Sequence, residues 1–199
     1  MLLRSITAAG LLAVAGCQTH DLRATRVPAG GGVVDNVVPL PEALRRFRND
    51  LPAVTRLAGG EATREGLVRA FARALEARDT AALRAMVLSK AEFAWLYYPT
   101  AREANPPYGL PPALAWFTQE GRGDRGLRVA LEVLGGRPIR YLGHECAPEP
   151  RVEGENRLWG FCVVSHLGER GDTLRAQLFG LILERGGMYK FVSYANKLD

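Results

Sequence analysis

Cys146 and Cys162 are the residues whose type and spacing point most directly to chemistry. Residues 139–146 and 158–167 alternate between apolar and polar side chains as strands do, and a loop rich in turn-forming residues separates them. If the two strands form a hairpin centred near Gly154, Cys146 lies opposite Cys162. Opposed residues on paired strands are close enough for a disulfide bond.

A metal site is the alternative interpretation of the same hairpin. His144 and His166 are each an even number of residues from the cysteine on their own strand, so all four side chains would project from one face. Two cysteines and two histidines can bind Zn²⁺ tetrahedrally, but structural zinc sites normally take their ligands from short loops. The gap between the cysteines matches no common zinc-finger spacing, so the sequence favours the disulfide over zinc or two free thiols.

The N-terminal residues have the layout of a secretory signal. Arg4 supplies a positive start, a mainly apolar run follows over residues 6–15, and small residues lead to Cys17. The run is shorter than the roughly 20 apolar residues that cross a bilayer as a helix. An exported chain enters an oxidising compartment, where two remaining cysteines usually form a disulfide.

The segment Val14-Ala15-Gly16-Cys17 resembles the lipobox of bacterial lipoproteins. The resemblance implies that a lipid is attached to the Cys17 sulfur and that cleavage then makes Cys17 the new N-terminus. Gln18, in place of Asp, resembles the default signal for sorting to an outer membrane, facing the periplasm. The alternative is an ordinary signal peptide in which Cys17 is incidental. We therefore expect a signal peptide over residues 1–16 and membrane attachment through Cys17.

The rest of the chain divides into a tether and a domain. Residues 17–40 contain Pro28, the run Gly30-Gly31-Gly32 and Pro39 without a sustained period, which is typical of a flexible tether. Residues 41–199 are long enough for a single well-buried domain. The apolar fraction of 47% and the charged fraction of 24% are those of a globular protein.

The distribution of charge excludes one class of partner. The formal net charge is +5, with 23 arginines and three lysines, but the arginines are scattered and interleaved with Asp and Glu. Nucleic-acid binding needs a clustered basic face. The sequence therefore predicts no nucleic-acid partner.

No catalytic motif is recognisable. The sequence has no Gly-rich phosphate loop, no Gly-x-Ser-x-Gly elbow and no pair of histidines at metal-ligand spacing on a helix. Each carboxylate in an apolar context has a structural explanation: Glu92 completes a capping box with Ser89, Asp79 caps a helix, and Glu184 lies at a turn. We assign no catalytic residue, no metal ligand and no cofactor.

Aromatic residues concentrate around a proline-rich segment and offer a candidate binding surface. The concentration comprises Trp95, Tyr97, Tyr98, Tyr108, Trp116 and Phe117. Helical spacing favours a core position for Tyr97, and Tyr98, Tyr108 and Trp116 are the candidates for contact with a ligand or partner. Tyrosine and tryptophan on a stiff backbone suit contact with a glycan, an envelope protein or a small apolar ligand. The alternative is that these rings fill the core between helices and sheet.

The periodicity predicts an α+β fold in which helices precede strands. Helices are expected from Pro41, over residues 63–78, after Asp79 and from the Ser89 capping box. A helical turn at 114–117 and a helix capped by Asp124 follow. Four strand-like runs then cover residues 139–146, 158–167, 173–184 and 188–194, the last two joined by a tight turn. This order predicts N-terminal helices packed on a four-stranded antiparallel curved sheet with a cone-like shape.

The order of elements and the segment Phe71-Ala72-Arg73-Ala74-Leu75-Glu76-Ala77-Arg78-Asp79 resemble the nuclear transport factor two-like superfamily over about residues 60–195. The resemblance implies a curved antiparallel sheet that wraps a long helix around a pocket. The superfamily includes isomerases, dehydratases and non-catalytic scaffolds, so the resemblance assigns no site residue. We expect a non-catalytic binding or scaffolding module in the cell envelope, with a small-molecule lyase or isomerase as the alternative.

Overall fold

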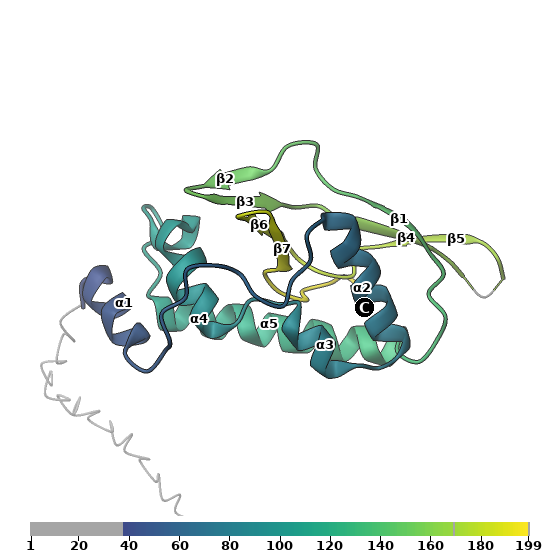
Figure 1. Ribbon diagram of the computed structural model, residues 1–199, viewed down its shortest axis with the longest axis horizontal. Helices are drawn as coiled ribbons and strands as arrows, with labels where there is room; N and C mark the ends of the chain where they lie inside the picture. Colours follow the sequence, from purple (N-terminus) through teal and green to yellow (C-terminus); the bar gives the residue numbers. More distant parts are fainter. Residues whose placement is uncertain (1–37, 169, 199) are drawn as a thin grey trace, which may run out of the picture. The chain divides into compact units, whose positions relative to one another are not determined.

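The computed structural model describes residues 38–168 and 170–198. The predicted signal peptide, Cys17 and the tether up to residue 37 lie outside the described residues. Helices come first and antiparallel strands follow, so the fold is α+β as predicted. In Figure 1 the strands lie along one side of the helices. The helices are α1 (Leu40–Arg48), α2 (Arg64–Glu76), α3 (Thr80–Ala85), α4 (Lys90–Glu92) and α5 (Pro112–Val133).

Short-range capping fixes the helix starts where the sequence predicts them. The Thr63 side chain accepts a hydrogen bond from the Gly66 backbone N–H at 2.9 Å at the start of α2. Asp79 caps α3 in the same way, through the Ala82 N–H. Ser89 and Glu92 form the reciprocal capping box of α4. The chain then continues as a π-helical turn, Phe93–Tyr97, and two 3₁₀ turns, Tyr98–Thr100 and Arg102–Ala104.

Helix α5 corrects the prediction for residues 112–133. The expected turn at 114–117 and the expected helix start at Asp124 belong to one helix of 22 residues that begins at Pro112. Its glycines suggest a break, but Gly126 is buried because the chain crosses it closely: a Cβ there would lie 1.7 Å from the Tyr194 carbonyl oxygen. Glycine therefore serves close packing here, and the packing overrides its low helix propensity.

The four predicted strand runs are present, but they contribute six of the seven strands in the described residues, because β2 lies in the segment predicted as a loop, and the strands form two sheets. One sheet has the order β1-β4-β5 and the other β2-β3-β6-β7, all antiparallel. The strands are β1 (Tyr141–Glu145), β2 (Arg151–Glu153), β3 (Asn156–Trp159), β4 (Val163–Leu167), β5 (Thr173–Ala176), β6 (Ile182–Arg185) and β7 (Met188–Phe191).

Breaks in the middle of the long runs divide the predicted single sheet. Phe161, between β3 and β4, has φ 52°, a left-handed conformation that interrupts a strand. Residues 177–181 interrupt the next run between β5 and β6. The predicted turn between β6 and β7 is confirmed, with Gly186 and Gly187 both at positive φ.

Two apolar clusters hold the helices on the sheets. The first surrounds Phe71 of α2, whose ring lies 5.3–5.6 Å from the rings of Phe179, Phe191 and Tyr194. The second surrounds Phe93 and includes Leu158 of β3. Among the helices of the described residues, none is both long enough and apolar enough to cross a membrane.

Candidate binding grooves beside helix α5

The structure places the three candidate aromatic residues in different surroundings. Tyr98 is only 2% exposed, and its hydroxyl donates to the Leu110 carbonyl. Trp116 is half-buried on α5, with its ring 5.2 Å from that of Phe93. Tyr108 is 54% exposed and accepts a hydrogen bond from Arg102 at 2.8 Å. The three rings therefore do not form one surface.

Two of the three line grooves beside α5. The Tyr98 groove, of about 430 Å³, lies between α5 and the segment that carries Tyr97 and Tyr98. The Trp116 groove, of about 440 Å³, lies between α5 and the residues around Lys90. Both volumes fall within the range of small-ligand sites.

The two grooves share a wall made by Gln119, Val192 and Ser193. Gln119 of α5 donates from Nε2 to the Val192 carbonyl oxygen at 3.0 Å. Val192 follows β7 and belongs to the second apolar cluster. This hydrogen bond links α5 to the chain after β7 at the wall that the two grooves share.

A carboxyl and a phenol converge on the Tyr98 groove. Glu103 lines the groove, and its Oε2 is buried without a hydrogen-bond partner among the described residues. Burial raises the pKa of Tyr97, and the negative charges of Glu103 and Glu153 raise it further. Tyr97 therefore stays protonated and can donate a hydrogen bond, while Glu103 can accept one. The remaining walls are largely apolar, which suits a ligand with a ring or a short chain.

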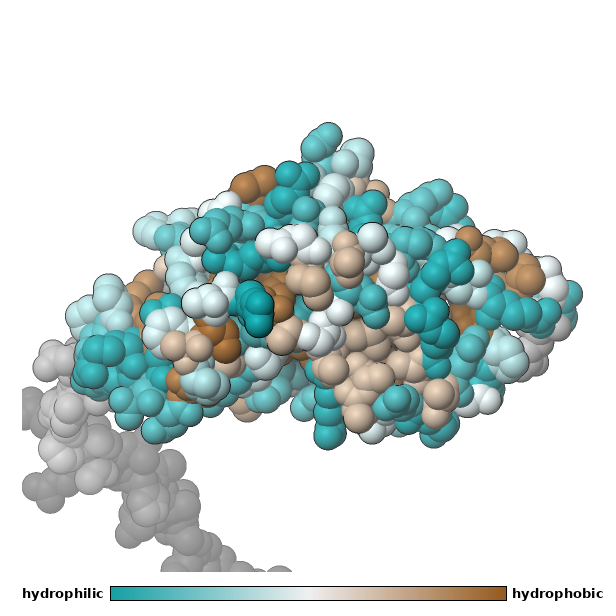
Figure 2. Space-filling view, viewed as in Figure 1, coloured by the Kyte–Doolittle hydropathy of each residue, from teal (hydrophilic) through white to brown (hydrophobic). Residues whose placement is uncertain are grey.

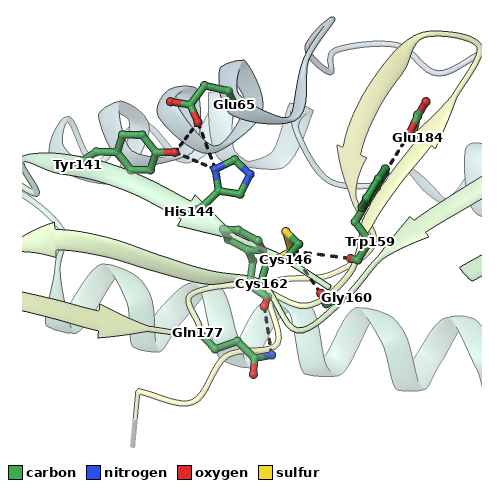
Figure 3. Close-up of a disulfide and its surroundings, with 10 residues drawn as sticks. Glu65, Tyr141, His144, Cys146, Trp159, Gly160, Cys162, Gln177 and Glu184 are labelled. Carbon is green, nitrogen blue, oxygen red and sulfur yellow. Dashed lines mark hydrogen bonds and ion pairs between the residues drawn. A yellow bond between two sulfur atoms is a disulfide. The ribbon is translucent and has the colours of Figure 1, made fainter. Parts of the chain in front are cut away.

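A second polar cluster, not recognised from the sequence, joins α2 to β1 (Figure 3). Glu65 Oε2 accepts a hydrogen bond from the Tyr141 hydroxyl at 2.8 Å and lies 3.2 Å from His144 Nδ1. The Tyr141 hydroxyl oxygen also lies 2.8 Å from His144 Nδ1. Burial lowers the pKa of His144, and the nearby charge of Arg64 lowers it further. Burial opposes ionisation of Glu65, but hydrogen bonds from Tyr141 and Arg69 outweigh it and lower the pKa of that carboxyl.

The predicted disulfide between Cys146 and Cys162 is confirmed. Glu145 of β1 pairs with Val163 of β4. Cys146 follows Glu145 and Cys162 precedes Val163, so the same register places the two cysteines opposite each other. The bond lies below the His144 cluster in Figure 3. Both thiols of the alternative zinc set are thereby consumed, and the described residues contain no group of three or more metal-ligating side chains.

The sequence predicts a structural role for each of three carboxylates, those of Glu92, Asp79 and Glu184. Glu92 and Asp79 are caps as predicted. Glu184 lies within β6 instead of at a turn, and its Oε2 accepts from Trp159 Nε1 at 2.9 Å. Its role is thus to hold β6 to β3.

The surface view shows how hydrophobic residues are distributed on one face of the protein. On the face in Figure 2, hydrophobic residues form small patches, over β2 and near the β4–β5 end, among hydrophilic ones. The exposed large hydrophobic side chains include Val152 of β2 and Leu174 of β5. The same view shows a broader, mildly hydrophobic area over α2 and α3.

Sequence reasoning missed the residues that shape the grooves. Gln119 and Ser193 belong to no motif, and they meet only because α5 crosses the end of the sheet. Glu103 lies in the proline-rich segment, where no helical or strand periodicity marks it. A charged residue in a proline-rich stretch is the only signal that the sequence offers for it.

No protein-family model matches the chain, and comparisons with curated proteins and with solved structures found no similar protein.

Proposed function

We propose that this protein is a lipid-anchored binding module of the cell envelope, held to the membrane by an acylated Cys17 and binding its ligand in the grooves beside α5. The order of charge, apolar run and Cys17 supports the anchor. Where the cell has an outer membrane, Gln18 favours anchoring there on the periplasmic side. The ligand is an envelope protein segment, a glycan or a small apolar molecule.

The observation that carries the binding role is the pair of grooves. Each has the volume of a small-ligand site, and each takes one aromatic wall residue from the predicted set: Tyr98 in one and Trp116 in the other. Aromatic walls with a few polar groups bind apolar or sugar rings.

Photo-crosslinking in the native envelope tests the binding role. A crosslinking amino acid at Arg122, which is exposed and lines the Tyr98 groove, should yield a discrete adduct. The same group at Arg73, exposed on α2 and outside both grooves, is the control. Adding Thr118→Trp, which fills the Tyr98 groove, should abolish the adduct while leaving the melting temperature unchanged. Identical patterns from Arg122 and Arg73 would refute the proposal.

The anchor is tested separately. Cys17→Ala should leave an uncleaved or soluble exported form, because no sulfur remains to be acylated. The measurements are the intact N-terminal mass and the partition between membrane and soluble fractions. An unchanged mass and an unchanged partition would exclude acylation at Cys17.

A second candidate function, a small-molecule lyase or isomerase, is favoured by one observation. Glu103, whose Oε2 has no hydrogen-bond partner among the described residues, and the protonated Tyr97 both line the Tyr98 groove, where they offer a substrate one acceptor and one donor. Under this alternative, Glu103→Gln keeps ligand binding but abolishes conversion. The order of helices and antiparallel strands supports a relation to the nuclear transport factor two-like superfamily, which contains both kinds of protein.

A further inference from the structure

The outward side of α5 carries apolar residues at one end and arginines at the other. Leu114, Phe117, Gly121, Arg125 and Arg128 follow each other at intervals of three or four residues, so they share one side of the helix. All five are exposed, and Phe117 is 72% and Leu114 49% exposed. An apolar pair and a basic pair thus lie about 12 Å apart along one helix.

The basic end of α5 borders a third groove. This space of about 620 Å³ lies between α5 and the α3 region, and its walls carry Arg78, Arg84, Arg125 and Arg128 against Asp124 and Glu132. Within the part of the chain that the structure describes, no carboxylate lies within 4.0 Å of the guanidinium nitrogens of Arg84, Arg125 or Arg128. The groove wall therefore carries four arginines against two carboxylates, and three of these arginines form no close ion pair among the described residues.

We infer that this side of α5 docks on the surface of an anionic phospholipid bilayer. Phe117 and Leu114 would enter the boundary between headgroups and acyl chains, and the arginines would contact lipid phosphates. Transfer of an apolar side chain out of water is favourable in free energy when the partner has an apolar layer to receive it. Guanidinium groups without an ion-pair partner bind phosphate well. A bilayer with anionic headgroups supplies both an apolar layer and phosphate groups, and it does so within the distance between the apolar pair and the basic pair on α5.

The inference rests on the proposed lipid anchor, which would keep this surface near a membrane. The described chain begins at Val38, immediately before α1, and α1 packs against α5. The residues between Cys17 and Val38 can span at most about 70 Å. A domain on so short a tether contacts the bilayer often. Docking through α5 would then set which side of the domain faces the bilayer.

Vesicle co-sedimentation without the acyl anchor tests the docking surface by itself. The mature chain, residues 17–199 with Cys17→Ser, retains every described residue and cannot be acylated. We expect it to sediment with vesicles of equal parts phosphatidylglycerol and phosphatidylcholine and to stay in solution with pure phosphatidylcholine vesicles. Binding should weaken as salt concentration rises. Phe117→Ser should reduce it roughly tenfold, and Arg125→Gln and Arg128→Gln about fivefold each.

Matched controls separate the docking surface from general effects. Phe161→Ser removes another exposed phenylalanine, and Arg73→Gln removes another exposed arginine; both should leave vesicle binding unchanged. Thermal melting of every variant confirms that it is folded. Equal binding to both kinds of vesicle, no binding to either, or equal losses in the control variants would overturn the inference. A protein partner for this side of α5 would appear as no binding to either vesicle. None of these outcomes bears on acylation, which the N-terminal mass reports.

Discussion

The Lys190 ammonium lies 2.8 Å from Glu92 Oε2 in the interior, with both side chains less than 5% exposed. Lys190 also donates to the Ala58 carbonyl at 2.6 Å, and Glu92 accepts from the backbone N–H groups of Ala58 and Ser89. The pair ties β7 to the end of α4 and to the loop before α2. The capping glutamate recognised from the sequence is therefore also one partner of a buried ion pair.

Breaking this pair should be strongly destabilising. Glu92→Ala leaves a buried ammonium without its counter-ion, and we expect a loss of about 3–5 kcal/mol in the free energy of unfolding. The measurement is urea unfolding at pH 7. The single variants Glu92→Gln and Lys190→Met each leave one buried charge without its partner. The double variant Glu92→Gln with Lys190→Met leaves no uncompensated charge, so it should lose less stability than the sum of these two single variants. Additive losses would show that the two residues do not interact.

Reducing the disulfide should lower stability without changing the fold. Cys146 and Cys162 are separated by 16 positions, for which loop-closure entropy gives about 3 kcal/mol. Unfolding of the protein with and without reductant measures the difference. Intact mass after alkylation of the native protein provides the control: two modified thiols at these positions before reduction would contradict the bond.

Stability should fall between pH 7.5 and pH 5.5 because of His144. Its side chain is 5% exposed, and burial lowers its pKa below the usual 6.5. The unfolded chain therefore takes up a proton near pH 6.5 while the folded protein does not, so stability is full above that pH and declines below it. The lowered pKa of Glu65 acts only below its usual 4.5, outside this window. His144→Gln should flatten the dependence of the melting temperature on pH; an equal slope in both proteins would contradict the assignment.

Two glycines of α5 should respond in opposite ways to alanine. Gly126→Ala places a Cβ 1.7 Å from the Tyr194 carbonyl oxygen, and we expect a loss of about 3 kcal/mol or more as the crossing chain is displaced. Gly121→Ala meets no heavy atom within 4 Å, so it should gain about 1 kcal/mol from helix propensity alone. Thermal or urea unfolding of both variants decides this. A similar loss at both positions would show that the helix, and not the contact with Tyr194, is the cause.

The sequence by itself determined the features that depend on neighbouring residues. The caps by Thr63, Asp79 and Ser89 are bonds between residues three positions apart, so they need no tertiary context. The disulfide depends only on the register of one hairpin, which the alternation of residues sets. The α+β order of elements also follows from local periodicity.

Only the tertiary structure decided the length of α5, the division of the sheet and the grooves. Gly121 and Gly126 have low helix propensity, but packing against the chain at Tyr194 makes Gly126 necessary inside a helix. The left-handed Phe161 breaks a run that alternation alone makes continuous. The grooves are walled by residues from α5 and from the chain after β7, such as Gln119 and Ser193. Their proximity depends on how whole elements pack, which no local pattern encodes.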